Sequence, residues 1–381
     1  MSGSGYFTFE KRPGDCPWLD LVRAIAIGVV LLRHGQRAVA PPSDIAPDFL
    51  QAFLLNGWIG VDLFFVLSGY LISRHLLRYG LGTGHFDLAR YLAMRALRIV
   101  PAYFVVMALV VAAAFPLYQV TSEHLGLRVA YHALFLQDYL PSNINVVFWS
   151  LGVEEKFYLL APVLIWFAIT RGSLRGSMLV ILAASALSPL IRAAIYVVQT
   201  TPLSYEAFFA TFRSPFHTCL EPLMAGVAIA VAQHAGAVTV SPRNGSRLVG
   251  VALIVLTVFL ASHEFMRVIG PFDVVAQPTI IAILCGLLTL GAVMMGNAPA
   301  PCEPVVRLTA RLSYCLYLVH YPLVPLAVAL SRDSEFPVVG FWITFLAVSF
   351  AVACLLHFSV EKPFLVLKDK LARGRLARAT A

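Results

Sequence analysis

Long apolar stretches, separated by short polar loops, run through almost the whole sequence. The hydrocarbon core of a bilayer is about 30 Å thick, so a helix needs about 20 mostly apolar residues to cross it. Ten stretches meet this requirement: residues 19–37, 57–77, 100–118, 147–169, 177–198, 216–233, 248–263, 278–296, 312–330 and 338–358. The pattern therefore predicts an all-α polytopic membrane protein with about ten transmembrane helices.

One further apolar stretch, residues 124–140, differs from the others because it contains Arg128, His132 and Asp138. Ionisable side chains are costly near the centre of a bilayer. We therefore expect an interfacial or re-entrant helix here rather than an eleventh span.

The composition agrees with a membrane protein. The chain is 59% hydrophobic and 13% charged, with a mean hydropathy of +0.81, whereas a soluble domain carries about 25% charged residues. These values exclude a water-soluble globule, and the high hydrophobicity excludes a disordered chain. The net charge of +8 does not indicate a nucleic-acid partner, because the basic residues lie mainly in loops on one side of the predicted membrane.

The distribution of basic residues predicts the orientation. If the N-terminus is inside and ten spans alternate, the inside segments hold nineteen lysines and arginines and the outside loops hold five. Basic residues concentrate on the cytoplasmic side of membrane proteins, so we expect both termini there. The chain then divides into a cytoplasmic N-terminal segment (1–18), a transmembrane domain (19–360) and a basic cytoplasmic tail (361–381).

The cysteines show no pattern typical of a metal site or a disulfide framework. None forms a C-x-x-C pair or has a histidine partner at metal-binding spacing. We expect them to be small buried apolar side chains and predict no bound metal. They are Cys16, Cys219, Cys285, Cys302, Cys315 and Cys354.

Two ionisable residues stand on one face of the first span. Eleven residues separate Arg23 from His34, which brings them to within roughly 20° of each other around the helix and about 16 Å apart along it. A second histidine, His320, is expected at a similar depth in the ninth span. Alternatively, Arg23 extends to the membrane interface and His34 is a packing residue bonded to a backbone carbonyl.

Two arginines in the second inside loop, Arg95 and Arg98, are three residues apart and would share a helix face. Their forked donors could bind a phosphate or a carboxylate from two sides. The same arginines could simply provide the positive charge that orients the protein.

The fourth span begins with two adjacent carboxylates, Glu154 and Glu155. Packing does not explain such a pair in an apolar helix. They could cap the helix N-terminus, with Lys156 as a local partner, or they could position or deprotonate a histidine or a hydroxyl. Further candidates for the lining of an intramembrane pore are Ser68, Tyr70, Trp149, Ser150, Tyr317, His320 and Glu361.

Together these residues predict a cavity with arginines at its inner mouth, histidine at its centre and carboxylates toward the outside. Such a cavity suits an anionic cytoplasmic donor that meets a neutral acceptor. A secondary transporter is the main alternative, in which buried His and Glu relay protons and the arginines bind an anionic solute. Transporters often contain inverted repeats, and the sequence has no such symmetry.

The order of the motifs resembles the acyltransferase-3 family of multi-spanning bacterial O-acyltransferases. The resemblance covers nearly the whole chain. It rests on Leu19-Asp20-x-x-Arg23-x10-His34, on Gly60-Val61-Asp62-Leu63-Phe64-Phe65-Val66-Leu67-Ser68-Gly69-Tyr70, on Arg95-x-x-Arg98-Ile-x-Pro101, on Trp149-Ser150-Leu151-x-Val153-Glu154-Glu155-x-Phe157-Tyr158, on Ser313-Tyr314-x-Leu316-Tyr317-Leu318-x-His320 and on Glu361-Lys362-Pro363-Phe364.

The resemblance implies a multi-pass enzyme of the bacterial inner membrane. Its reaction would move an acyl group, usually acetyl, from acyl-CoA to a hydroxyl of a glycan, a glycolipid or a glycosylated small molecule. Gly152 and Lys156 depart from the family pattern, which usually has Ser and Gln there. Many members also carry a C-terminal extracytoplasmic esterase-like domain, which this sequence does not include.

The family roles carry over to matching positions. His34 corresponds to the essential histidine, with Arg23 as its paired arginine that supports the donor or the oxyanion. Arg95 and Arg98 correspond to the CoA side. We expect His34 to be the general base, with Glu154 or Glu155 orienting it or holding the acceptor; an acyl-histidine relay is the competing version. The sequence leaves open the acceptor's identity, its side of entry and the oligomeric state.

Overall fold

The computed structural model describes residues 9, 16–39, 48–79, 86–120, 124–141, 143–199, 203–262 and 269–379. Side chains of residues 48, 79 and 372–379 are not described. The predicted N-terminal segment 1–18 lies outside the described residues except for residues 9 and 16–18, and residues 380 and 381 of the predicted tail also lie outside them.

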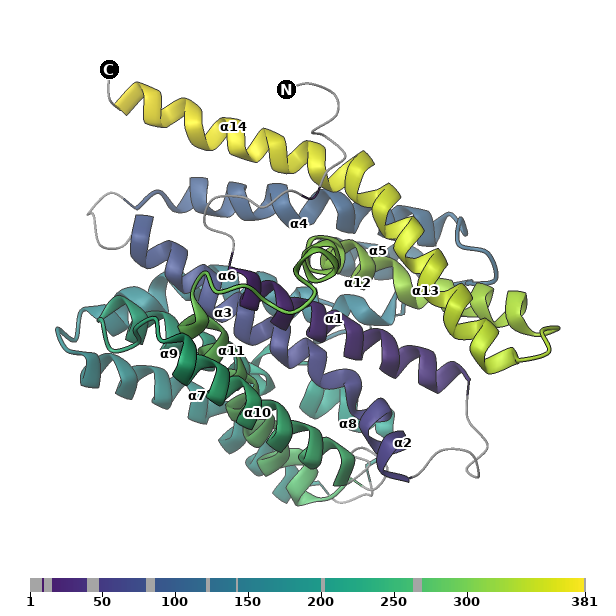
Figure 1. The fold of residues 1–381 in the computed structure, drawn as a ribbon, viewed down its shortest axis with the longest axis horizontal. Helices are drawn as coiled ribbons and strands as arrows, with labels where there is room; N and C mark the ends of the chain where they lie inside the picture. Colours follow the sequence, from purple (N-terminus) through teal and green to yellow (C-terminus); the bar gives the residue numbers. More distant parts are fainter. Residues whose placement is uncertain are drawn as a thin grey trace.

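The described residues form helices and connecting segments without any strand, which confirms the predicted all-α class (Figure 1). Long helices pack side by side, and π-helical and 3-10 turns extend several of them. The elements are α1 (Pro17–Ala38), α2 (Asp48–Leu55), η2 (Asn56–Ile59), α3 (Gly60–Tyr79), α4 (Leu88–Val111), α5 (Leu125–Ala133), η3 (Val146–Phe148), α6 (Trp149–Ile169), α7 (Leu174–Val197), α8 (Tyr205–Phe208), η4 (Phe209–Arg213), η5 (Phe216–Thr218), α9 (Leu220–His234), α10 (Pro242–Ser262), η6 (Phe272–Ala276), α11 (Gln277–Met295), α12 (Glu303–Ser331), α13 (Pro337–Leu356), η7 (His357–Glu361) and α14 (Lys362–Ala379).

Within the described ranges, seven helical segments are long and apolar enough to cross a membrane. They are Phe49–Arg78, Leu88–Val111, Leu174–Val197, Pro242–Ser262, Phe272–Met295, Glu303–Ser331 and Pro337–Leu371. Three predicted spans correspond to helices outside this set. Helix α9 has 15 residues, and it reaches the length that a bilayer about 30 Å thick requires only together with the preceding turn η5. Helices α1 and α6 each carry several ionisable residues, and both contain predicted site residues.

Several predicted boundaries were wrong. Helix α4 begins at Leu88 and ends at Val111, whereas the predicted span ran from 100 to 118. Arg95 and Arg98 therefore lie inside this helix and not in a loop, because the helix accommodates Pro101 without ending. The predicted stretch 124–140 contains the short helix α5 and turns, and it is not among the segments able to cross a membrane.

Helix α13 continues through the π-helical turn η7 directly into α14, so residues 362–379 of the predicted tail are helical. Figure 1 shows α14 beside α4, away from the layer formed by α7, α9, α10 and α11. Helix α1 crosses the centre of the molecule and contacts α3, α11 and α12. This central position places the α1 side chains between the other helices that form the site.

Two glycines, Gly60 and Gly69, allow α3 to approach its neighbours closely. A β-carbon at Gly69 would collide with the carbonyl oxygen of Leu223 in α9, and one at Gly60 would collide with the carbonyl oxygen of Ala26 in α1. Small residues permit such contacts between membrane helices. The first turn of α3 is therefore held against the middle of α1.

A fully buried ion pair joins α7 to α9. Arg192 donates both terminal nitrogens to the Glu221 carboxylate at 2.6 Å, and it also donates to the carbonyl oxygens of Val274 and Thr218 at 2.7 Å. Glu221 is thus an ion-pair partner that closes a helix–helix contact. Two-pronged pairing with additional hydrogen bonds is the geometry that makes a buried charge pair tolerable.

Candidate functional site

Two adjacent cavities lie among the central helices, and most of the predicted residues line one or the other. The arginine cavity has a volume of about 320 Å³ and is formed by side chains from α1, α3, α4, α6 and α12. The histidine cavity has a volume of about 860 Å³ and extends toward η2, α8, η4 and the segment between α5 and η3. The sequence predicted a single cavity, and the predicted lining residues are here distributed over two adjacent ones.

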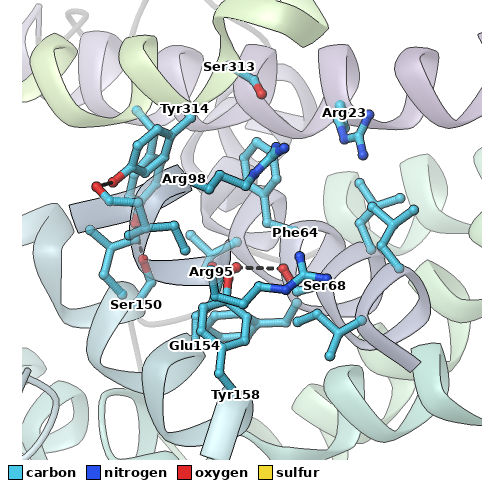
Figure 2. A pocket seen from close by; sticks show the side chains of 18 of the residues that line it. Arg23, Phe64, Ser68, Arg95, Arg98, Ser150, Glu154, Tyr158, Ser313 and Tyr314 are labelled. Carbon is cyan, nitrogen blue, oxygen red and sulfur yellow. Dashed lines mark hydrogen bonds between the residues drawn. The ribbon is translucent and has the colours of Figure 1, made fainter. Parts of the chain in front are cut away.

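The arginine cavity combines cationic and hydroxyl groups from five helices, as Figure 2 shows. Arg95 and Arg98 come from successive turns of α4 and reach the same space as Ser68 of α3 and Glu154 of α6. Arg23 enters from α1. The polar members of the lining are Arg23, Ser68, His75, Arg95, Arg98, Ser150, Glu154, Tyr158, Ser313, Tyr314 and Tyr317.

The three arginines differ in their partners. Arg23 forms an ion pair with Asp20 one turn earlier in α1, with 2.9 Å between Nη1 and Oδ1. Within the described part of the chain, Arg95 and Arg98 form no ion pair with an acidic side chain. Arg95 instead lies 5.9 Å from the centre of the Tyr158 ring. The cavity therefore has positive charge that an anionic ligand can pair with.

Glu154 is bound to hydroxyl groups and not to a histidine. Its Oε1 accepts a hydrogen bond from Ser68 at 2.7 Å, and its Oε2 accepts one from Tyr158 at 3.1 Å. Glu155, the next residue, lines neither cavity, and its buried Oε1 has no hydrogen-bond partner among the described residues. The structure does not bring either carboxylate to His34, whose side chain lines the other cavity.

His34 lines the histidine cavity and pairs with His320, which is completely buried behind it. The Nδ1 of His34 lies 2.9 Å from the Nε2 of His320, and the Nδ1 of His320 lies 3.0 Å from the carbonyl oxygen of Leu316. A carbonyl oxygen only accepts, so Nδ1 of His320 must carry the proton and Nε2 of a neutral His320 must accept. His34 therefore donates from Nδ1, which leaves its Nε2 unprotonated.

The histidine cavity has an aromatic wall with a few charged groups. Arg213 donates hydrogen bonds from both terminal nitrogens to the Asp62 carboxylate, at 2.9 and 2.8 Å. Its guanidinium lies 4.9 Å from the Trp58 ring centre and 5.2 Å from the Trp149 ring centre. The aromatic members of the lining are Trp58, Tyr118, Tyr139, Trp149, Tyr205, Phe209, Tyr317 and Tyr321. Flat apolar rings alternating with polar groups are suited to a ligand with both apolar faces and hydroxyls.

Lys156, which the sequence suggested as a partner of the glutamates, pairs elsewhere. Its Nζ donates to Oδ1 of Asp138 at 2.6 Å and to the carbonyl oxygen of Phe135 at 2.7 Å. Burial raises the pKa of Asp138 above its ordinary value, and the contact with Lys156 opposes that rise. The pair anchors the segment after α5 to α6 and closes one side of the histidine cavity.

Val61 and Tyr317 are the two described residues that line both cavities. The Tyr317 hydroxyl donates to the carbonyl oxygen of Val147 at 2.9 Å and lies 2.7 Å from Oγ of Ser150. The Phe64 ring meets the Tyr317 ring edge to face at 6.2 Å. These contacts hold the ring at the boundary between the cavities.

The structure gathers some predicted residues and separates others. Arg23, Ser68, Arg95, Arg98, Ser150 and Glu154 line the arginine cavity, His34 and Trp149 line the histidine cavity, and Tyr317 lines both. Tyr70 and Glu361 line neither cavity. Tyr70 donates to Gln233 of α9 at 2.8 Å. The Glu361 carboxylate lies 2.6 Å from Nδ1 of His357 and accepts from the Cys315 thiol at 3.1 Å.

Several residues that line the cavities were not predicted as site residues. His75 and Tyr158 face the arginine cavity, and Arg213 and Tyr321 face the histidine cavity. The tyrosines of α12 could have been predicted, because Tyr314, Tyr317 and Tyr321 are spaced so that they share one face of a helix. The pairing of Arg213 with Asp62, 151 residues apart, has no comparable signal in the sequence.

Comparison with known proteins agrees with the sequence motifs. Residues 17–358 match the acyltransferase-3 family model, described as an acyltransferase domain, and the chain belongs to this family. It is 26% identical over 354 residues to the peptidoglycan O-acetyltransferase OatA of Listeria monocytogenes, a match that covers 86% of this chain and 54% of that protein. It is also 26% identical over 365 residues to the O-acetyltransferase OatA of Staphylococcus aureus strain NCTC 8325, which covers 89% of this chain and 56% of that protein.

The chain thus spans a little over half the length of these curated relatives. No solved structure matches it.

Proposed function

We propose that the protein is an integral-membrane O-acyltransferase that moves an acyl group, acetyl in the simplest case, from acyl-CoA to a hydroxyl of a carbohydrate or glycoconjugate. The single observation that carries this proposal is the His34–His320 pair. It leaves an unprotonated Nε2 on a histidine that lines a large cavity, and a cavity rich in arginine adjoins that cavity. Family membership supports the same reaction class.

The arginine cavity would bind the donor. CoA carries several phosphate charges, and guanidinium groups bind phosphates through paired donors. Arg95 and Arg98 have no acidic partner in the described residues and are free to take this role. A volume of about 320 Å³ lies at the lower end for ligand pockets. We infer that it encloses the thioester arm and leaves the nucleotide at the mouth.

His34 would act as the general base. The acceptor oxygen attacks the thioester carbonyl carbon while its proton moves to Nε2 of His34. The tetrahedral intermediate then expels CoA as a thiolate when the C–S bond breaks, and that thiolate takes up the proton from His34. A positioned base typically contributes 10²–10⁴-fold to the rate. His320 would be a positioning residue, because its hydrogen bond selects the tautomer of His34.

Arg23 would support the donor and not the oxyanion. It lines the arginine cavity, and it stands eleven residues from His34 on the same helix, which corresponds to about 16 Å. Glu154 lines the same cavity and would order Ser68 and Tyr158 around the bound donor. These assignments differ from the expectation that a glutamate orients His34.

The histidine cavity would bind the acceptor. Its rings offer faces for the C–H surfaces of a sugar, and the charged groups among them offer partners for hydroxyls. The relative from Listeria monocytogenes is named a peptidoglycan O-acetyltransferase, which is consistent with a glycan acceptor. A transporter is not supported, because the chain belongs to an acyltransferase family.

The topology that fits this function has ten spans with both termini in the cytoplasm, in the bacterial inner membrane. Helices α1, α6 and α9 would join the seven apolar segments as the remaining three spans, with their polar residues buried among the other helices. The predicted positive-inside bias places the arginine cavity toward the cytoplasm, where acyl-CoA is made. The histidine cavity then faces the outer half of the membrane.

The proposal is tested with inside-out membrane vesicles from bacteria that express the full chain. Acetyl-CoA labelled in the acetyl group is added, and base-labile label in the glycan fraction is measured and identified by mass spectrometry. We expect label above the level of vesicles from cells with the empty vector. Equal label in both preparations would contradict the proposed function.

A further inference from the structure

The donor and the base are assigned to different cavities, so the acyl group must cross the boundary between them. Arg95 and Arg98 line one cavity, and His34 lines the other. Of the described residues, Val61 of α3 and Tyr317 of α12 line both. An acyl group that moves from the arginine cavity to the acceptor in the histidine cavity therefore passes these two side chains.

Tyr317 offers little freedom on its side of the boundary. It is only 6% exposed, its hydroxyl is tied to the Val147 carbonyl oxygen and to Ser150, and its ring abuts Phe64. Moving the ring would leave the buried Tyr317 hydroxyl without its two partners, which costs about 1–3 kcal/mol.

Val61 is fixed in a different way. The side chain is β-branched, which restricts it to few rotamers, and it is 7% exposed. Its neighbour Gly60 lies against the Ala26 carbonyl of α1 without room for a β-carbon. Its other neighbour, Asp62, is held by both terminal nitrogens of Arg213. The backbone at Val61 is thus held from two sides.

We propose that Val61 and Tyr317 determine which acyl groups the protein transfers, because they set the width of the passage between the donor and acceptor cavities. This inference rests on the proposed function. A rigid passage discriminates by cross-section, so the flat acetyl group passes and an acyl group branched at its second carbon does not. One misplaced methylene in a rigid apolar site changes kcat/KM by roughly 10–200-fold.

The test compares acetyl-CoA with isobutyryl-CoA in the vesicle assay and uses the ratio of their kcat/KM values. We expect the wild-type protein to favour acetyl by at least about a hundredfold. Val61→Ala removes two methyl groups from the passage, and it should shift the ratio toward isobutyryl by about tenfold or more. Val61→Ile narrows the passage and should reduce the use of propionyl-CoA relative to acetyl-CoA.

A matched control and a second variant keep the test decisive. Val249→Ala makes the same change at a buried valine of α10 that lines neither cavity, and the isobutyryl-to-acetyl ratio should stay at the wild-type value. Tyr317→Phe keeps the ring but removes both hydroxyl contacts, so it should shift the ratio in the same direction as Val61→Ala.

The outcomes separate this inference from the proposed function. In one outcome, the wild-type vesicles transfer acetyl while the ratio of kcat/KM values stays the same in Val61→Ala, Val61→Ile and Tyr317→Phe. That result would overturn the role of the passage and leave the acyltransferase assignment in place. Wild-type vesicles that transfer no acyl group above the empty-vector level would contradict the proposed function itself.

Discussion

Nδ1 of His34 lies 2.9 Å from Nε2 of His320, although 286 residues separate them in the chain. The Leu316 carbonyl oxygen determines the direction of this hydrogen bond, because it accepts a hydrogen bond from Nδ1 of His320. A carbonyl at the end of the chain of bonds thus determines which nitrogen of His34 holds a lone pair. That nitrogen is the one available to an acceptor hydroxyl in the histidine cavity.

His320 should therefore act through His34. We expect His320→Ala to lower kcat for acetyl transfer by at least about tenfold, because His34 loses the acceptor that selects its tautomer; loss of a comparable orienting group costs up to about 10⁴ in a serine protease. The KM for acetyl-CoA should change little, since His320 does not line the arginine cavity. Steady-state kinetics in vesicles measures both values.

A conservative variant distinguishes orientation from packing. The amide oxygen of His320→Gln can occupy the place of Nε2 and accept from His34, so this variant should recover part of the lost kcat. If His320→Gln and His320→Ala were equally slow and both less stable to heat than the wild type, His320 would serve packing alone.

Arg98 should contribute to donor binding. Arg98→Ala removes a cation that has no acidic partner in the described residues, so the KM for acetyl-CoA should rise about tenfold or more, while kcat at saturating donor changes less. Arg98→Lys keeps the charge but loses the paired guanidinium donors, so its KM for acetyl-CoA should lie between those of the wild type and Arg98→Ala. Arg171→Ala, which removes an arginine stacked on Phe167 outside both cavities, should have the wild-type KM. An unchanged KM in Arg98→Ala would place the CoA phosphates elsewhere.

Glu154 provides a test of the division into two cavities. Its charge lies beside the arginines and not beside His34. Glu154→Gln can still accept from Ser68 but removes a negative charge from a cavity that would bind a polyanion. We therefore expect the KM for acetyl-CoA to fall by roughly two- to tenfold, equivalent to about 1 kcal/mol of lost repulsion. A collapse of kcat with an unchanged KM would instead mean that Glu154 orients the base.

The ion pair of Arg192 with Glu221 should support the fold and not the reaction, since neither residue lines a cavity. Arg192→Leu leaves a buried carboxylate without its partner, which typically costs about 3–5 kcal/mol. We expect a clearly lower midpoint of thermal unfolding in detergent. The double variant Arg192→Leu with Glu221→Leu should recover much of that loss. A single variant as stable as the wild type would show that the pair contributes nothing.

The sequence predicted the helices well because membrane thickness sets a simple length requirement. Each of the ten apolar stretches coincides with a helix, although α4 begins at Leu88 and not at residue 100. Helical periodicity also placed Arg23 and His34 on one face of α1, and both line cavities. These features depend on local spacing, which a single sequence contains.

The division of the site could not be predicted in the same way. The boundary between the two cavities involves Val61 and Tyr317, which come from helices far apart in the chain. The partner of Lys156 likewise depends on the fold after α5, which brings Asp138 within 2.6 Å. Charge and spacing alone favoured the adjacent glutamates, which were the nearest carboxylates in sequence.

The most direct test of the central claim replaces the base and keeps its hydrogen bond. The amide nitrogen of His34→Asn can still donate to Nε2 of His320, but the variant has no basic nitrogen that can take a proton. His234→Asn, an exposed histidine outside both cavities, is the matched control. We measure the single-turnover rate of acetyl transfer, together with acetyl-CoA affinity and thermal stability.

We predict that His34→Asn lowers this rate by at least about a hundredfold, with wild-type affinity and stability, and that His234→Asn transfers acetyl at the wild-type rate. Transfer by His34→Asn at the rate of the control would contradict the account.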